Sequence, residues 1–227
     1  MMNGQRGSRS PLRREPAQRS RPSDGETVGV VALGLTGGIG AGKSTALALF
    51  RELGAITVSA DDLVHELYAR PFVAAEIEAR FGPEVLDSQG AVDRSRLAES
   101  VRGRRRELRR LEKLIHPLVE EEIEKMITRA PVGSVIVCEV PLLFESGFER
   151  LFDLVVTVEA SGETRRRRST HDFDLDMFSE LEGLQASSER RVAGSDLSFF
   201  NDGDKEQLRK FVEEAYAKAQ ELLGERR

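Results

Sequence analysis

Gly37-Gly38-Ile39-Gly40-Ala41-Gly42-Lys43-Ser44-Thr45 follows the pattern of a glycine, four residues and then G-K-[S/T]. Glycines let backbone N–H groups turn toward phosphate oxygens, and a helix that begins at the loop adds partial positive charge. In such a loop the lysine reaches the β and γ phosphates of a nucleotide and the serine hydroxyl binds Mg²⁺. We therefore assign these roles to Lys43 and Ser44, and expect ATP to be held by Gly38, Gly40, Ala41, Gly42, Lys43, Ser44 and Thr45.

The residues around this loop predict the fold. Val28 to Thr36 is an apolar run without polar alternation, as in a parallel strand buried on both faces, and a helical pattern follows from Lys43 to Leu53. Further β-rich runs alternate with helical segments, at Ile56 to Ser59, Ser134 to Val140, Leu154 to Glu159 and Leu197 to Phe200. A last helix at 205–223 has one apolar side. This alternation predicts an α/β fold, the three-layer sandwich of P-loop NTPases with a parallel five-stranded sheet, a helical insert and a small lid.

Composition and length divide the chain further. Residues 1–27 are rich in arginine and serine and poor in core-forming residues, so we expect a disordered extension, with a transit peptide or a misplaced start codon as alternatives. Residues 63–129 exceed one crossover helix and are interpreted as a helical acceptor-binding subdomain. The charged segment 164–185 is interpreted as a lid. The predicted nucleotide-binding core consists of 28–62, 130–163 and 186–227.

The composition narrows the class of protein and its partners. A formal net charge of −5 argues against a nucleic-acid binder, and no segment resembles a membrane span. The single cysteine, Cys138, excludes an intramolecular disulfide and fits a reducing compartment, so we expect a cytoplasmic protein. We expect a monomer or a weak homo-oligomer that acts on a small molecule.

Other side chains decide between the classes of protein that share such a loop. Ras-type GTPases need an N-K-x-D motif, and no asparagine of this chain is followed by lysine. A kinase needs a carboxylate beside the acceptor hydroxyl, and Asp61 follows the second predicted strand at the rim where α/β sheets bind ligands. Asp61 is therefore the candidate general base; the alternative is that Asp61 or Asp62 caps a helix beginning at Leu63. Glu139, at the end of the third strand, is a candidate for the Mg²⁺ shell or else a solvated carboxylate.

The chain resembles the dephospho-CoA kinase family in motifs spread over nearly all of residues 28–223. The motifs are L-T-G-G-I-G-A-G-K-S-T at 35–45, S-A-D at 59–61, H-P-L at 116–118 and P-L-L-F-E at 141–145, followed by Glu163-Thr164, Arg168, Gln185 and Asn201-Asp202-Gly203. The resemblance implies phosphorylation of the ribose 3′-hydroxyl of dephospho-CoA by ATP with Mg²⁺, the final step of coenzyme A synthesis.

The same resemblance implies roles for individual residues. Asp61 would be the base, Lys43 would stabilise the transferred phosphoryl group and Arg168 would clamp the ATP phosphates. Asn201 and Gly203 would lie in the loop beside adenine. The implied acceptor site contains Asp61, His116, Pro141 and Leu142. A histidine before a proline at a helix break is otherwise more often structural.

Some positions depart from the family pattern. Ser59 stands where an aspartate is common, the lid is shorter than usual, His171 replaces an arginine and Gly194 replaces a residue with a side chain. A weakened lid leaves a nucleotide-binding regulator as an alternative function, and another nucleoside or nucleotide kinase is the second alternative.

Two runs of arginine carry much of the positive charge. We expect Arg165, Arg166 and Arg167 to form a solvated helix face and Arg168 to be functional. The run at Arg102, Arg104 to Arg106, Arg109 and Arg110 is expected to solvate the insert, or else to attract an anionic acceptor.

Overall fold

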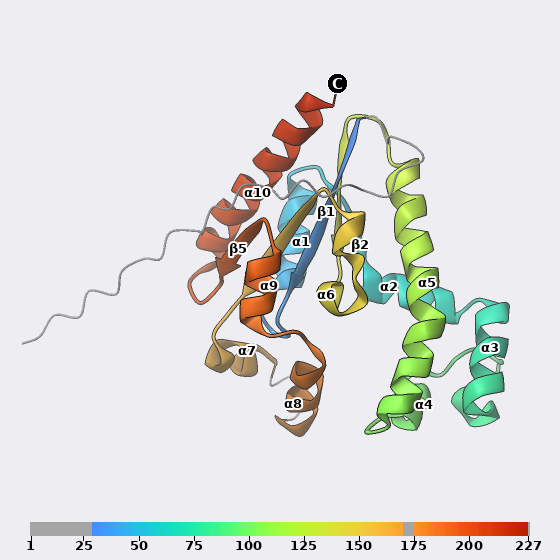
Figure 1. Cartoon of the computed structure of the whole chain (residues 1–227). Helices are drawn as coiled ribbons and strands as arrows, with labels where there is room; N and C mark the ends of the chain where they lie inside the picture. The colour runs from blue at the N-terminus through green and yellow to red at the C-terminus, as the bar shows by residue number, and fades with distance from the viewer. Residues whose placement is uncertain (1–28, 170–174, 227) are drawn as a thin grey trace, which may run out of the picture. The chain divides into compact units, whose positions relative to one another are not determined.

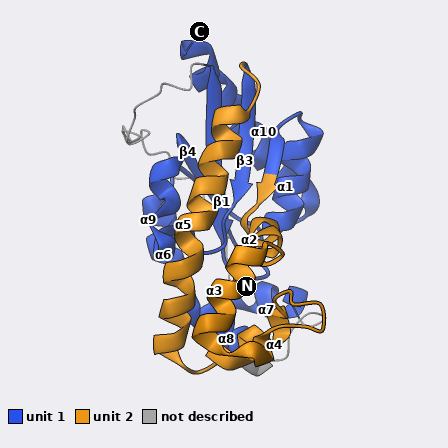
Figure 2. Cartoon of the chain, turned by 90° about the vertical axis from the view of Figure 1, so that its right-hand side faces the viewer, with its two compact units in different colours: residues 1–57, 133–227 blue, residues 58–132 orange. Residues whose placement is uncertain are grey.

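The computed structural model describes residues 29–169 and 175–226 (Figure 1). The expected N-terminal extension, residues 1–27, and His171 lie outside these residues. The chain divides into two compact units, residues 1–57 with 133–227 (unit 1) and residues 58–132 (unit 2), which are coloured separately in Figure 2. Among the described residues, none of the helices combines the length and the apolar character that a membrane crossing requires.

The sheet is five-stranded, with the strand order β2-β3-β1-β4-β5. Its strands are β1 Val30–Gly37, β2 Ile56–Ser59, β3 Ser134–Glu139, β4 Leu154–Glu159 and β5 Leu197–Phe200. The pairs β1 with β3, β1 with β4 and β4 with β5 are parallel. All residues of β1 and β4 are buried, which is why these strands are continuous apolar runs in the sequence. The predicted α/β fold with a parallel five-stranded sheet is confirmed.

Helices cover both faces of this sheet. The helices α1 (Lys43–Glu52) and α10 (Lys205–Glu225) pack against each other and against β1 and β3. Their apolar sides form one core with alternate residues of the strands; this core includes Leu33, Leu35, Leu49, Phe50, Val137, Val156, Phe211 and Val212. Each large side chain buried in this way contributes roughly 1.5–3 kcal/mol.

The opposite face is covered by shorter elements. These are α6 (Leu143–Ser146), the 3₁₀ turn η2 (Phe148–Leu151) and α9 (Ser188–Gly194). Gly34 of β1 allows their close approach, because a Cβ atom there would lie 2.6 Å from the Phe152 ring and 2.8 Å from Leu143 Cδ1. Two further helices of unit 1 are α7 (Gly162–Ser169) and α8 (Leu175–Leu184).

Unit 2 is helical. It contains α2 (Ala60–Tyr68), α3 (Pro71–Phe81), the 3₁₀ turn η1 (Pro83–Val85), α4 (Arg94–Val101) and α5 (Arg105–Arg129). In α5 the buried residues recur every four positions, at Ile115, Val119, Ile123 and Ile127. The helix runs through Pro117, so the expected break at His116 is wrong. We attribute the tolerance of the proline to the packing of this buried spine, which offsets the lost backbone hydrogen bond.

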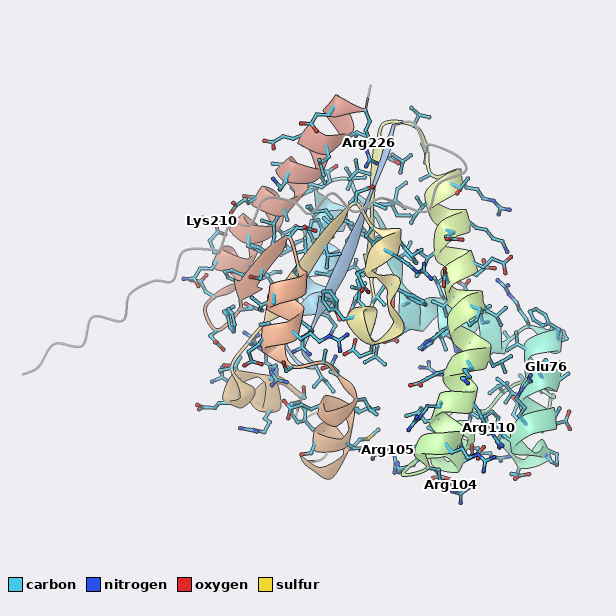
Figure 3. All side chains as sticks on the ribbon, in the orientation of Figure 1. Glu76, Arg104, Arg105, Arg110, Lys210 and Arg226 are labelled. Atoms are coloured by element: carbon cyan, nitrogen blue, oxygen red, sulfur yellow. The ribbon has the colours of Figure 1, made fainter. Side chains whose placement is uncertain are left out.

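The arginine run within residues 102–110 lies between the end of α4 and the first turns of α5. Arg104, Arg105 and Arg110 project there in Figure 3, and all six arginines of the run are exposed. Arg110 Nη1 pairs with Glu107 at 3.1 Å in the same helix. The run therefore forms a solvated surface of unit 2, as predicted from its charge.

Candidate active site

The glycine-rich loop joins the central strand to the first helix. Gly40 and Gly42 have φ angles of 72° and 105°, in the left-handed region that favours glycine. Gly42 is the N-cap of α1, and no side chain of the described residues caps the helix there. The helix begins without an acidic residue in its first turn. The backbone amides and partial positive charge of this helix N-terminus are therefore suited to an anion.

Lys43 lies over this loop. Its side chain is only 9% exposed, and Nζ donates to the carbonyl oxygens of Gly37 and Gly38, each at 3.2 Å. The ammonium group is thus held at the loop by backbone oxygens. A phosphate group bound in the loop would offer it a stronger, charge-assisted partner.

Two candidate Mg²⁺ ligands lie at this end of the sheet. Ser44 is exposed in the first turn of α1, next to exposed Thr45. Glu139 is half-buried at the end of β3, opposite Leu35 of β1 in the parallel register. The described residues contain no group of three or more His, Cys, Asp or Glu side chains that could hold a metal ion. A hydroxyl and a carboxylate fit Mg²⁺, which keeps several waters and takes its other ligands from nucleotide phosphates.

Arg168 of α7 also reaches the loop. Its Nη1 donates to the carbonyl oxygen of Ala41 at 3.4 Å and would lie 3.9 Å from a Cβ atom on Gly42. The structure therefore brings Arg168 and Lys43 to the same short loop from different helices. An anion bound in this loop would have both cations near it.

The expectation that Arg165 lies on a solvated face is wrong. Its side chain is 13% exposed, pairs with Glu182 of α8 at 2.5 Å and lies over the Phe178 ring at 6.0 Å. A Cβ atom on Gly38 would be 3.0 Å from Arg165 Cδ, and one on Gly40 would be 2.5 Å from the Arg165 carbonyl oxygen. The loop glycines thus allow α7 to approach closely. The neighbours Arg166 and Arg167 are exposed, as expected.

Asn201 supports the loop from the end of β5. Its side chain is buried, and Nδ2 donates to the Ala41 carbonyl oxygen at 2.8 Å, the oxygen that also accepts from Arg168.

Asp202 accepts from the Ser161 backbone at 2.9 Å. Burial raises the pKa of Asp202, but hydrogen bonds from Ser161 and Thr164 outweigh this effect, so the pKa is lowered and the carboxylate stays charged. Gly203 follows in the same loop, where a Cβ atom would meet Gln207.

Pro141 and Leu142 follow β3 in the same unit. Both are half-buried, and the Pro141 carbonyl oxygen accepts from Gln185 Nε2 at 3.2 Å. Leu142 is the N-cap of α6. The side chain of Gln185 therefore holds this segment beside the glycine-rich loop, since it also binds the backbone of Ile39 and Gly37.

Asp61 lies in unit 2, in the first turn of α2, and is exposed. The helix begins at Ala60, and its N-cap is Ser59, whose Oγ accepts from the Asp62 backbone at 3.4 Å. The alternative that Asp61 or Asp62 caps a helix beginning at Leu63 is therefore wrong. Serine and aspartate are both good N-caps, so Ser59 can replace an aspartate at this position without losing the cap. The side chain of Asp61 is left available for another role.

His116 is half-buried in α5 of unit 2, beside buried Ile115. Burial lowers the pKa of His116, and the charge of Glu112 opposes this effect. The imidazole is therefore mainly neutral at pH 7, and can serve as a hydrogen-bonding group toward a polar ligand.

Two charged residues that the sequence analysis did not identify lie near the loop. Arg191 of α9 pairs with Glu159 at the end of β4, and its Nη2 would lie 3.3 Å from a Cβ atom on Gly38. A signal was available, because Glu159 ends a buried apolar strand and a buried carboxylate requires a cationic partner. The sequence did not reveal which arginine supplies it.

Comparisons with known proteins show which family this chain is similar to. The family model described as dephospho-CoA kinase matches residues 31–207. The dephospho-CoA kinase of Thermobifida fusca (strain YX) is 34% identical over 200 residues, which are 87% of this chain and 100% of that protein. The dephospho-CoA kinase of Streptomyces avermitilis is 37% identical over 201 residues, covering 83% of this chain and 93% of the relative.

Two solved structures have folds similar to that of this chain. A Thermus thermophilus protein superposes with a TM-score of 0.72 and 29% identity, covering 84% of this chain and 98% of that one. Dephospho-CoA kinase from Campylobacter jejuni superposes with a TM-score of 0.65 and 24% identity, covering 85% of this chain and 98% of its own.

Proposed function

The chain belongs to the dephospho-CoA kinase family, and from this membership we infer that it transfers a phosphoryl group from ATP to dephospho-CoA, the last step of coenzyme A synthesis. The acceptor group in this proposal is the ribose 3′-hydroxyl. The observation that supports it best is the loop of unit 1, where an uncapped helix N-terminus, Lys43 and Arg168 converge.

The residues of unit 1 bind and orient the phosphates in this proposal. Loop amides from Gly38 to Thr45 hold the phosphate oxygens, and Lys43 Nζ exchanges the Gly37 and Gly38 carbonyls for the β and γ phosphates. Arg168 neutralises charge that develops during transfer, an effect worth about 10³ to 10⁵ in rate for a phosphate-clamping arginine. Asn201 and Gly203 flank the adenine.

A bound Mg²⁺ ion would be held by Ser44, with Glu139 in its outer shell, and would supply charge neutralisation at the phosphates. Among the chain's own residues, Asp61 accepts or orients the proton of the acceptor hydroxyl, and a positioned base of this kind contributes about 10² to 10⁴ in rate. His116, Pro141 and Leu142 contact the acceptor. Transfer depends on alignment of the hydroxyl with the γ phosphate, because phosphoryl transfer asks the protein mainly for positioning.

A cytoplasmic location and a monomeric or weakly associating state without nucleic-acid partners complete the proposal. Cys138 is the single cysteine, so no intramolecular disulfide can form, and burial raises the pKa of its thiol to about 12. Such a thiol is inert toward oxidation and exchange.

The experiment that tests the proposed function is a coupled assay of ADP release from ATP. We expect release to depend on added dephospho-CoA and the product to comigrate with coenzyme A. A panel of nucleosides and nucleotides serves as the control for acceptor choice. ADP release that is equal with every acceptor, or tight ATP binding without release, would contradict the assignment.

A further inference from the structure

The side chain of Gln185 makes three hydrogen bonds with backbone groups around the glycine-rich loop. Its Oε1 accepts from Ile39 N at 2.9 Å, and its Nε2 donates to the carbonyl oxygens of Gly37 and Pro141, both at 3.2 Å. Gln185 follows the end of α8, and lies 146 residues from Ile39 in the chain. One amide group thus joins the start of the loop to the segment that follows β3.

The partners fix the orientation of this amide. Ile39 offers an N–H, so it must face the amide oxygen, and the two carbonyl oxygens must face the amide nitrogen. Glutamate has the same shape but, when ionised, only accepts hydrogen bonds, so it would place negative charge against the carbonyls of Gly37 and Pro141. The site therefore requires a neutral group that both donates and accepts.

The Gly37 carbonyl oxygen has two donors. Lys43 Nζ and Gln185 Nε2 both bind it at 3.2 Å. When Lys43 turns to a phosphate, this oxygen loses one of them. Gln185 continues to satisfy it, and a buried carbonyl left without a donor would be destabilising.

Independent contacts hold Gln185 in place. The backbone N–H of Ala186 donates to Glu145 Oε1, and the Ala186 carbonyl oxygen accepts from Arg191. Arg191 is itself fixed by its buried pair with Glu159. The Gln185 amide is thus presented to the loop by a segment that is tied to α6 and α9.

We propose that Gln185 is a positioning residue for ATP binding: it holds the Gly37 to Ile39 turn in its binding shape and satisfies the Gly37 carbonyl when Lys43 leaves for the phosphates. This inference rests on the proposed function, because it needs the loop to be the ATP site. Gln185 touches the loop backbone and acts on the nucleotide through that backbone.

The test uses the full-length chain with Gln185→Met, which keeps the length of the side chain without its polar group, and Gln185→Glu. We expect the Kd for ATP to rise about tenfold in Gln185→Met, since the hydrogen bonds that hold the loop in its binding shape are lost. Gln185→Glu should weaken binding at least as much at neutral pH. Calorimetric titration with Mg·ATP measures both variants, and Gln185→Glu decides the question if Gln185→Met fails to fold.

Two comparison variants separate positioning from general stability. Glu145→Ala removes one of the two bonds that hold Ala186 and keeps the Arg191 bond and all three Gln185 bonds, so its unfolding temperature should fall while its Kd for ATP stays within about twofold of the wild type. Gln220→Glu places the same new charge at an exposed position of α10 and should change neither quantity. Gln185 variants with wild-type ATP affinity, or a Glu145→Ala effect equal to theirs, would overturn the proposal. Absence of ATP binding by the wild type would instead contradict the proposed function.

Discussion

Arg191 and Glu159 form a buried ion pair that joins α9 to the end of β4. Arg191 Nε lies 2.5 Å from Glu159 Oε1 and Nη2 lies 2.9 Å from Oε2, and the side chains are 4% and 1% exposed. Two parallel hydrogen bonds with both groups removed from water make this a bidentate pair. Removing one partner of such a pair is strongly destabilising, mainly because the other charge is then buried without a partner.

Arg191→Met should therefore lower the free energy of unfolding by about 3–5 kcal/mol, because it leaves the Glu159 carboxylate buried without a cation. Urea denaturation followed by circular dichroism measures this change. Arg209→Met is the matched control: Arg209 pairs with Glu52 at 2.9 Å, but the side chains are 35% and 53% exposed. Its loss should cost less than about 1 kcal/mol. Equal losses in the two variants would show that burial does not govern the Arg191 pair.

The strands of the sheet could be predicted from the sequence because their signal is local. Burial on both faces makes β4 a mostly apolar run without polar alternation, and this pattern predicts its bounds at Leu154 and Glu159. The start of α2 was predicted three residues too late, because three polar residues around Ser59 can each cap a helix. Propensity does not decide between neighbouring caps of similar strength.

Contacts between distant segments had no comparable signal. Arg165 stands in a run of four arginines, yet it alone of the first three is packed under the loop, against Glu182 and Phe178. Which side of α7 is buried depends on the segments that the helix packs against, and these are distant in the sequence. A charge run therefore indicated a solvated face correctly for Arg166 and Arg167, and wrongly for Arg165.

Gly194 of α9 packs directly on Phe144. A Cβ atom at Gly194 would lie 2.6 Å from Phe144 Cε1, closer than two carbon atoms can pack. We expect Gly194→Ala to lower the free energy of unfolding by about 1–3 kcal/mol, the cost of overpacking a core. Gly183→Ala in α8 is the control, since among the described residues no atom beyond its chain neighbours and its own helix backbone lies within 4 Å of the added methyl group. It should be neutral or stabilising by up to about 1 kcal/mol. Thermal unfolding of both variants tests the contrast, and a stabilised Gly194→Ala would contradict it.

His116 should make unfolding dependent on pH. Burial lowers its pKa in the folded state, so the unfolded chain binds more protons as the pH falls from the ordinary value toward the folded one. The contribution of His116 to stability is therefore present above pH about 6.5 and is lost as the pH falls below it, by at most 1.4 kcal/mol per pH unit. Urea midpoints measured between pH 8 and pH 5 should fall less steeply in His116→Gln than in the wild type, and His65→Gln, at an exposed position, should match the wild type. Identical slopes in all three proteins would contradict the effect of burial.

Asp61 and Asp62 share the first turn of α2 and are both exposed, so they form a matched pair for the catalytic proposal. Both carboxylates gain a similar stabilisation from the helix N-terminus, about 0.3–1 kcal/mol, so Asp61→Asn and Asp62→Asn should lower stability to a similar small extent. Only Asp61→Asn should lower turnover, by about 10² to 10⁴, because an amide cannot take the proton from the hydroxyl of the acceptor substrate. Its Kd for ATP should stay unchanged, since the base acts on the other substrate. Steady-state ADP release with dephospho-CoA and calorimetry with ATP measure the two quantities separately. Wild-type turnover in Asp61→Asn, or an equal loss in Asp62→Asn, would remove Asp61 from the role of general base.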